Sequence, residues 1–117
     1  MRMTLQEKQA VFCRLIASLI HEAWKRGYTL TFGEAWRPPE TAALYAKQGR
    51  GIKNSLHTQR LAIDFNLFRN GKWLTKADDF EGLGLFWESL STPEAKCAWG
   101  GRFGDGNHFS IFHNGIK

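Results

Sequence analysis

The stretch of sequence that decides the fold is Leu61-Ala-Ile-Asp-Phe-Asn-Leu-Phe68. Its β-branched and aromatic residues predict a strand, in which successive side chains point to opposite faces of a sheet. One face would carry Leu61, Ile63, Phe65 and Leu67, and the other Ala62, Asp64, Asn66 and Phe68. The wholly apolar face must pack on a core. Asp64 is therefore predicted to point into a cleft, beside an alanine that leaves room for a metal ion.

Two histidines flank this strand in the sequence. His57 lies upstream, in or just after a loop, and a short turn can bring it back over the strand. His108 begins another short strand, directly after the turn Phe103-Gly-Asp-Gly-Asn107, whose residues tolerate positive φ. This arrangement can aim His108 and the carboxylate of Asp105 at one point.

Two imidazoles and a carboxylate, from His57, His108 and Asp64, form a ligand set that suits zinc. Three protein ligands leave a fourth position open for water, as a catalytic zinc site requires. The spare carboxylate of Asp105 can then handle protons for that water. The sequence therefore predicts a place to hold zinc and a group for acid/base chemistry beside it.

The other histidines and the cysteines have structural explanations. His21 falls on the solvated face of a predicted helix, and His113 on the strand face opposite to the last ligand. Cys13 lies next to the apolar stripe of that helix, and it forms no C-x-x-C pair with Cys97. Both thiols are expected to be reduced, the alternative being one disulfide between helices.

The chain as a whole predicts an α+β fold, a small, mostly antiparallel sheet with helices packed on one side of it. Thr4 and Glu7 form a capping box, and a helix follows as far as Gly27. Its apolar stripe consists of Val11, Phe12, Leu15, Ile16, Leu19, Ile20, Ala23 and Trp24. Further strands are predicted over 28–32 and 99–103, helices over 38–48 and 79–95, and a hairpin turn over 69–72. Because no linker or repeat interrupts the chain, residues 1–117 are expected to form one domain.

Composition limits the class of protein. The chain is 43% hydrophobic and carries five tryptophans, of which Trp36, Trp73 and Trp99 are expected to be in the core. A net charge of +5, spread along the chain, suits a polyanion such as nucleic acid or an anionic cell envelope. Without a basic run, a recognition-helix pattern or zinc-finger cysteines, nucleic-acid binding is not expected. The polar N-terminus predicts no signal peptide, and no apolar run approaches the ~18 residues of a membrane span.

Three blocks of sequence, in order, resemble a known family. They are Ser55-x-His-x-x-x-x-Ala-x-Asp64, Trp99-Gly-Gly and Asp105-x-x-His-Phe109. This pattern is similar to the D-alanyl-D-alanine carboxypeptidase and L-alanyl-D-glutamate endopeptidase family of zinc peptidases, which has a hedgehog/D-Ala-D-Ala peptidase-like fold. The segment from Glu34 to Glu40 resembles the region before the zinc motif, and residues 54–58 are typical of the phage endolysin branch.

The resemblance implies that zinc binds to His57, Asp64 and His108. It also implies that Asp105 is the acid/base carboxylate and that Arg37 holds the substrate or the developing oxyanion. The implied activity is hydrolysis of peptidoglycan stem peptides, with the L-alanyl-D-glutamate bond as the expected target, in a phage or prophage endolysin. Such a protein would be a monomer, made in the host cytoplasm and released to the periplasmic cell wall through a holin-type lesion.

Some details depart from the family or stay open. Ser110 stands where many relatives carry a glutamate, which affects the surroundings of the metal ligands rather than the ligands. Glu34 is expected to be a partner of Arg37. Two alternative functions remain, a D,D-carboxypeptidase that removes terminal D-alanine and a non-catalytic wall-binding or virion module.

Overall fold

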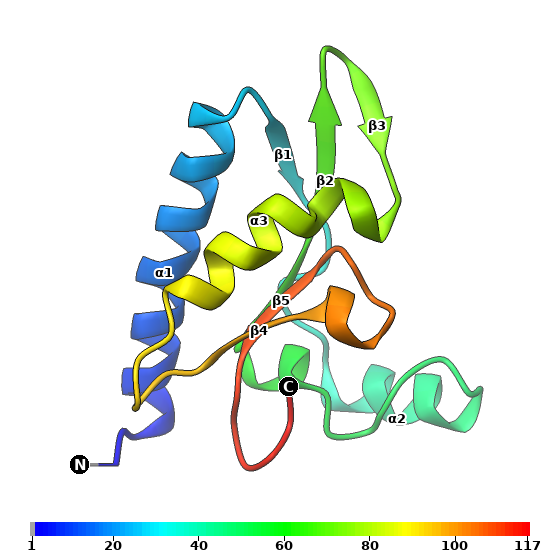
Figure 1. The fold of residues 1–117 in the computed structure, drawn as a ribbon. Helices are drawn as coiled ribbons and strands as arrows, with labels where there is room; N and C mark the ends of the chain where they lie inside the picture. Colours follow the sequence, from blue (N-terminus) through cyan, green and yellow to red (C-terminus); the bar gives the residue numbers. More distant parts are fainter. Residues whose placement is uncertain (1) are drawn as a thin grey trace.

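The computed structural model describes residues 2–117 and has an α+β architecture, as predicted (Figure 1). The elements are α1 (Leu5–Lys25), β1 (Thr29–Phe32), α2 (Pro39–Lys47), β2 (Ala62–Arg69), β3 (Lys72–Leu74), α3 (Ala77–Ser89), β4 (Cys97–Trp99) and β5 (His108–Ile111), with the short 3-10 helices η1 (Leu56–Gln59) and η2 (Gly100–Phe103). The strands form a small sheet in the order β1-β2-β5-β4, with β3 also paired to β2. Every strand pair is antiparallel.

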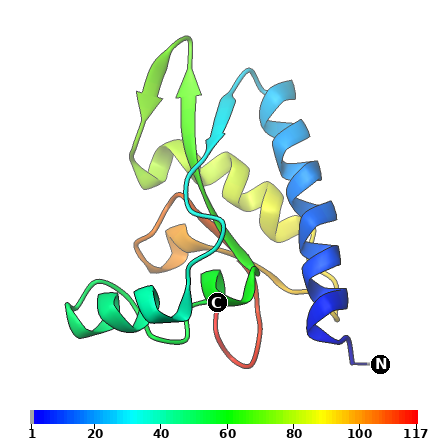
Figure 2. The ribbon, with the colours of Figure 1, turned by 180° about the vertical axis from the view of Figure 1, so that it is seen from behind.

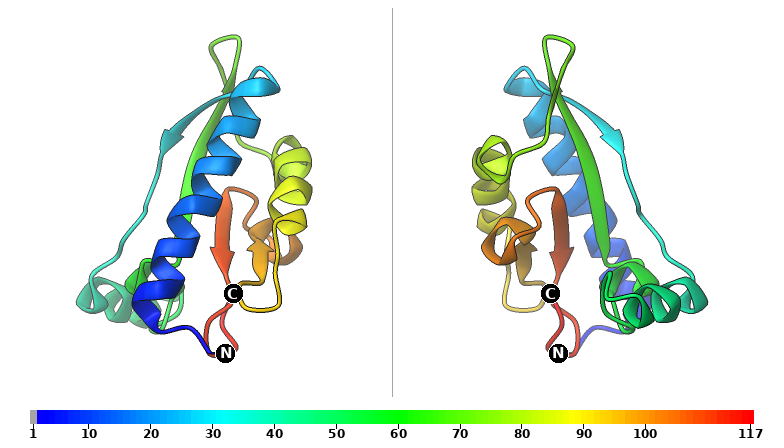
Figure 3. Two further views of the ribbon diagram at one scale, coloured as in Figure 1. Left: turned by 90° about the vertical axis from the view of Figure 1, so that its left-hand side faces the viewer. Right: turned by 90° about the vertical axis from the view of Figure 1, so that its right-hand side faces the viewer.

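The helix α1 begins and ends as the sequence predicts. Thr4 and Glu7 form the reciprocal capping box, and Gly27 adopts a φ of 84° just past the last turn. The helix contacts β1 and α3, which lie on either side of it in Figure 3. The predicted apolar stripe is too wide, because Trp24 is 73% exposed and Ile20 is 37% exposed. The sheet and α3 therefore cover a narrower side of α1 than the pattern of apolar residues indicates.

The core lies between the sheet and the pair of helices α1 and α3. The predicted alternation in β2 is confirmed, because its apolar face is fully buried while Asp64 is only half-buried. Trp87 of α3 packs edge-on against Phe12 of α1 and against Phe109 of β5, with ring centroids 5.9 and 6.2 Å apart. Its indole N–H donates to the carbonyl oxygens of Ala98 and Ser110. These two hydrogen bonds connect α3 to the strands β4 and β5.

Two predicted elements are wrong in extent. Residues 99–103 are not a strand, because after Trp99 the chain turns into η2. A Cβ atom on Gly100 would lie 2.0 Å from the carbonyl oxygen of Asp105, so the pair of glycines permits a tight turn rather than an extended strand. The helix predicted over 79–95 begins earlier and ends at Ser89, ahead of a turn that contains Pro93.

The predicted hairpin turn is confirmed between β2 and β3, where Asn70 and Gly71 both have positive φ. The helix α2 lies apart from α1 and α3, beside η1, as the view from behind also shows (Figure 2).

Cys13 is exposed, Cys97 is buried, and both are free thiols as expected. Within residues 2–117, no helix has the length and apolarity that crossing a membrane requires.

Candidate metal centre

The register of two strands brings together two of the three predicted ligands. In the antiparallel pair of β2 and β5, Asp64 lies directly opposite His108. Residues that face each other in this way project from the same side of a sheet. Because the other side of β2 packs on the core, both side chains project away from the helices α1 and α3. They meet on the open face of the sheet, as the alternation in the sequence predicts.

The third predicted ligand, His57, is held by the short helix η1. Ser55 caps this helix, and its hydroxyl oxygen accepts a hydrogen bond from the backbone N–H of His57 at 3.3 Å. Arg60 ends it in the left-handed conformation, with a φ of 56°, and turns the chain into β2. The backbone N–H of Arg37 donates to the carbonyl oxygen of His57 at 3.1 Å. His57 is thereby placed over the strand that carries Asp64.

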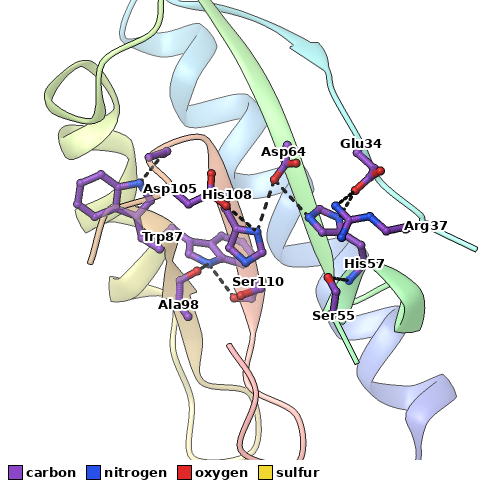
Figure 4. A network of polar contacts seen from close by, with 12 residues as sticks. Glu34, Arg37, Ser55, His57, Asp64, Trp87, Ala98, Asp105, His108 and Ser110 are labelled. Carbon is purple, nitrogen blue, oxygen red and sulfur yellow. Dashed lines mark hydrogen bonds and ion pairs between the residues drawn. The ribbon is translucent and has the colours of Figure 1, made fainter. Parts of the chain in front are cut away.

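The three side chains converge on one point. His57 Nε2 lies 3.4 Å and His108 Nδ1 lies 3.5 Å from the same atom, Asp64 Oδ1 (Figure 4). Suitable ligand atoms of the three residues all lie within 4.8 Å of one another, and both imidazoles are buried. Two nitrogen or oxygen ligands about 2.1 Å from a tetrahedral ion lie about 3.4 Å apart. The group of His57, Asp64 and His108 can therefore hold a metal ion.

The hydrogen bonding of the site agrees with this interpretation. Asp64 Oδ1 is buried and has no hydrogen-bond partner, although it is an acceptor with two imidazole nitrogens nearby. A buried carboxylate oxygen without a partner is costly, and a cation between these three atoms would satisfy it. Burial raises the pKa of Asp64, but the adjacent imidazoles of His108 and His57 outweigh burial and lower the pKa to about 2. At neutral pH the side chain is ionised, which is the form that binds a metal.

A carboxylate and a guanidinium lie behind His57. Glu34 Oε1 is 3.8 Å from His57 Nδ1, the ring nitrogen that points away from Asp64. The same carboxylate oxygen accepts a short hydrogen bond from Arg37, so the expected partnership of Glu34 and Arg37 is confirmed (Figure 4). Metal-binding histidines commonly direct their other nitrogen to a carboxylate, which fixes the orientation of the ring. Glu34 is thus in a position to orient both His57 and Arg37.

Asp105 lies at the edge of the same site. Its Oδ2 is 3.8 Å from His108 Nδ1, and its side chain remains 53% exposed. The tight turn at Gly100 holds it there, because the backbone N–H of Asp105 donates to the carbonyl oxygen of Gly100 at 2.8 Å. Partial burial raises the pKa of Asp105; the charge of Asp64 adds to this, while His108 opposes it. The raised pKa makes the carboxylate of Asp105 a better proton acceptor than an ordinary exposed aspartate.

The two histidines that the sequence excludes lie outside the site. His21 is exposed on α1. His113 Nδ1 is 3.2 Å from the ammonium of Lys8, at the other end of β5 from the ligands. Ser110 is buried, and its hydroxyl has no hydrogen-bond partner. Its side chain is not among the converging ligands.

Two concavities meet at Asp105. The first, of about 370 Å³, is lined by the three ligands, Arg37 and Asp105, together with Arg50, Phe103 and Lys117. The second, of about 450 Å³, extends from Asp105 towards β3 and is lined by Trp73. The expectation that Trp36 and Trp73 are core residues is wrong, because they are 44% and 61% exposed, whereas Trp99 is buried as expected.

The sequence did not indicate that Arg50 and Lys117 line the first concavity or that Trp73 lines the second. Arg50 follows α2 in a glycine-rich loop, and Lys117 lies beyond β5, so no local pattern connects either of them with the ligands. Trp73 had a local signal, because it follows Gly71 and Lys72 on a short edge strand.

A scan against models of protein families finds no match to this chain, and a search of curated proteins finds no significant match.

Proposed function

We propose that this chain is a zinc-dependent peptidase that hydrolyses peptidoglycan stem peptides, with the L-alanyl-D-glutamate bond as its target. The convergence of His57, Asp64 and His108 on one point, with the free carboxylate of Asp105 beside them, carries the proposal. The ligand set of two imidazoles and one carboxylate leaves a fourth position open, as hydrolytic zinc sites require. The three sequence blocks that resemble the zinc peptidase family, with its hedgehog-like fold, supply the substrate class.

The chemistry follows from the residues around the site. Bound zinc supplies a Lewis acid that polarises the scissile carbonyl and acidifies water in the cleft. Asp105 takes the proton from the attacking water and gives it to the leaving amine, for which its raised pKa and partial exposure are suited. Arg37 lines the same cleft, and its Nε is buried without a hydrogen-bond partner. Its guanidinium can therefore stabilise the oxyanion that develops on the carbonyl.

The proposed biological setting is a phage or prophage endolysin. The net charge of +5 suits an anionic cell wall. The protein would act as a monomer on the wall in the periplasm after synthesis in the host cytoplasm, with release through a holin-type lesion. Nucleic acid is not a proposed partner.

The first experiment measures hydrolysis and its dependence on the metal. Purified peptidoglycan is digested by the native protein, by chelator-treated protein and by chelator-treated protein with zinc restored, and new amino termini are identified by mass spectrometry. We expect new D-glutamate termini that disappear with chelator and return with zinc. The variant Asp105→Asn should bind zinc normally and lose about 10²–10⁴-fold in turnover, whereas Asp78→Asn, an exposed control on α3, should retain it.

Each other outcome has a distinct meaning. Release of free D-alanine would identify the D,D-carboxypeptidase activity in place of the endopeptidase. Binding of the wall without any hydrolysis, in native and Asp105→Asn protein alike, would identify a non-catalytic module. Hydrolysis that is unaffected by removing the metal would refute the proposal.

A further inference from the structure

The cleft contains two cations that form no ion pair with an acidic side chain of residues 2–117. Arg37 is already paired with Glu34. Arg50 and Lys117 line the same cleft, and neither takes part in an ion pair or a side-chain hydrogen bond with any other residue of 2–117. They lie in the concavity that also holds the proposed metal ligands. An anionic group in this cleft would therefore meet unpaired positive charge next to the reacting atoms.

Both cations rest on aromatic rings that limit where they can go. The guanidinium carbon of Arg50 lies 4.3 Å from the centroid of the Tyr45 ring, and the ammonium of Lys117 lies 5.6 Å from that of Phe103. The backbone N–H of Arg50 also donates to the carbonyl oxygen of Tyr45 at 2.7 Å. A cation over an aromatic face loses little hydration and stays available to a second partner at its free side. The aromatic contacts thus limit the positions of two solvent-exposed cations beside the cleft.

The second concavity, on the other side of Asp105, has a different chemistry. Its walls come from Trp73 and Leu74 of β3, from the start of α3 and from the turn before β5, and Asp105 is its only charged lining residue among residues 2–117. The side-chain amides of Asn66 and Asn107 are its main polar groups. Such a surface suits a neutral, partly apolar segment that offers peptide or hydroxyl groups. A substrate that occupies both concavities is therefore expected to pass Asp105, with its charged part in the first concavity and its neutral part in the second.

We infer that Arg50 and Lys117 select a substrate that carries a free carboxylate next to the scissile bond. This inference rests on the proposed function and refines it. In an L-alanyl-D-glutamate bond linked onward through the glutamate side chain, the free α-carboxylate belongs to the residue that supplies the leaving amine. That residue would lie in the cleft with Arg50 and Lys117, and the acyl half would lie along the concavity of Trp73. A groove open on both sides of the scissile bond favours cleavage within a peptide over trimming of its end.

The test compares two substrates that differ in one charge. One is a muramoyl peptide with D-glutamate, and the other has the α-carboxylate amidated. We expect native protein to show a KM about tenfold lower for the free acid, as one charge-assisted contact can provide. In the double variant Arg50→Gln/Lys117→Gln this preference should disappear, because the KM for the free acid rises to that for the amidated substrate. The control Arg14→Gln/Lys96→Gln removes the same charge from exposed positions outside both concavities and should keep the preference.

A binding measurement separates this inference from the proposed function. Dissociation constants of both peptides are measured by NMR titration on the metal-loaded Asp105→Asn protein, with and without the Arg50 and Lys117 substitutions. Equal binding of the two peptides, or a preference that survives the substitutions, would overturn the inference even if hydrolysis occurs. If native protein cleaves neither peptide, the proposed function fails, whereas preferential binding that the substitutions abolish would still support the role of these two cations.

Discussion

Glu34 illustrates how much of this site depends on a single side chain that is not a ligand. Its carboxylate lies 3.8 Å from His57 Nδ1 and accepts a hydrogen bond from Arg37, so it contacts one of the candidate metal ligands and a second residue that lines the cleft. Sequence reasoning paired Glu34 with Arg37 but did not connect it with His57. The connection requires η1 to fold back over β2, which only the three-dimensional structure shows.

The variant Glu34→Gln should weaken metal binding without unfolding the protein. The amide keeps the shape of the side chain but removes the charge that orients His57 and holds Arg37. Loss of such an outer partner typically lowers metal affinity about 10–100-fold. Zinc affinity is measured by competition with a chromophoric chelator, and Glu40→Gln in the first turn of α2 is the control. Equal zinc affinities of Glu34→Gln and native protein would show that Glu34 does not orient the ligand.

At the scale of elements, α3 and the segment after it depend on close contacts made by glycines. Gly84 is buried on α3, and a Cβ atom there would lie 2.1 Å from the indole ring of Trp99. Gly82, two residues earlier on the same helix, is exposed, and a Cβ atom there would meet only the flexible end of Arg26 at 3.2 Å. The two positions therefore test the same substitution in one helix with and without a rigid neighbour.

Alanine at these two positions should have opposite effects on stability. Gly84→Ala forces Trp99 out of place and should lower the free energy of unfolding by about 1–3 kcal/mol, as overpacking does. Gly82→Ala should raise it by up to about 1 kcal/mol, because alanine favours the helix. Both values come from urea denaturation followed by tryptophan fluorescence. A loss of stability at Gly82 equal to that at Gly84 would contradict the proposed packing of α3 on β4.

The elements also show where prediction from sequence succeeds and where it stops. Period-two alternation around Asp64 and the capping box at Thr4 are local patterns, and both are confirmed. The strand predicted over 99–103 fails because the contact that bends the chain, between Gly100 and Asp105, forms only when the turn closes. Arg50 and Lys117 could not be predicted as cleft residues for the same reason, since the fold alone brings these distant segments to His57 and His108.

For the whole molecule, the proposed site would link metal binding to folding. The three ligand residues come from η1, β2 and β5, so their correct spacing exists only when the sheet is assembled. An ion that binds the folded chain and not the unfolded one stabilises the fold by mass action. Zinc should therefore raise the melting temperature at pH 7, and His57→Gln should abolish this increase, whereas the exposed control His21→Gln should keep it.

Without zinc, Asp64 contributes to the stability of the fold in its ionised form. Its pKa is lowered from 3.8 to about 2, so its ionised form and the stability it contributes persist above 3.8 and are lost only as the pH falls towards 2. The difference in the free energy of unfolding between metal-free native protein and Asp64→Asn should therefore be at least as large at pH 5 as at pH 7, which urea denaturation at the two pH values measures. A difference that is smaller at pH 5 than at pH 7 would contradict the lowered pKa of Asp64.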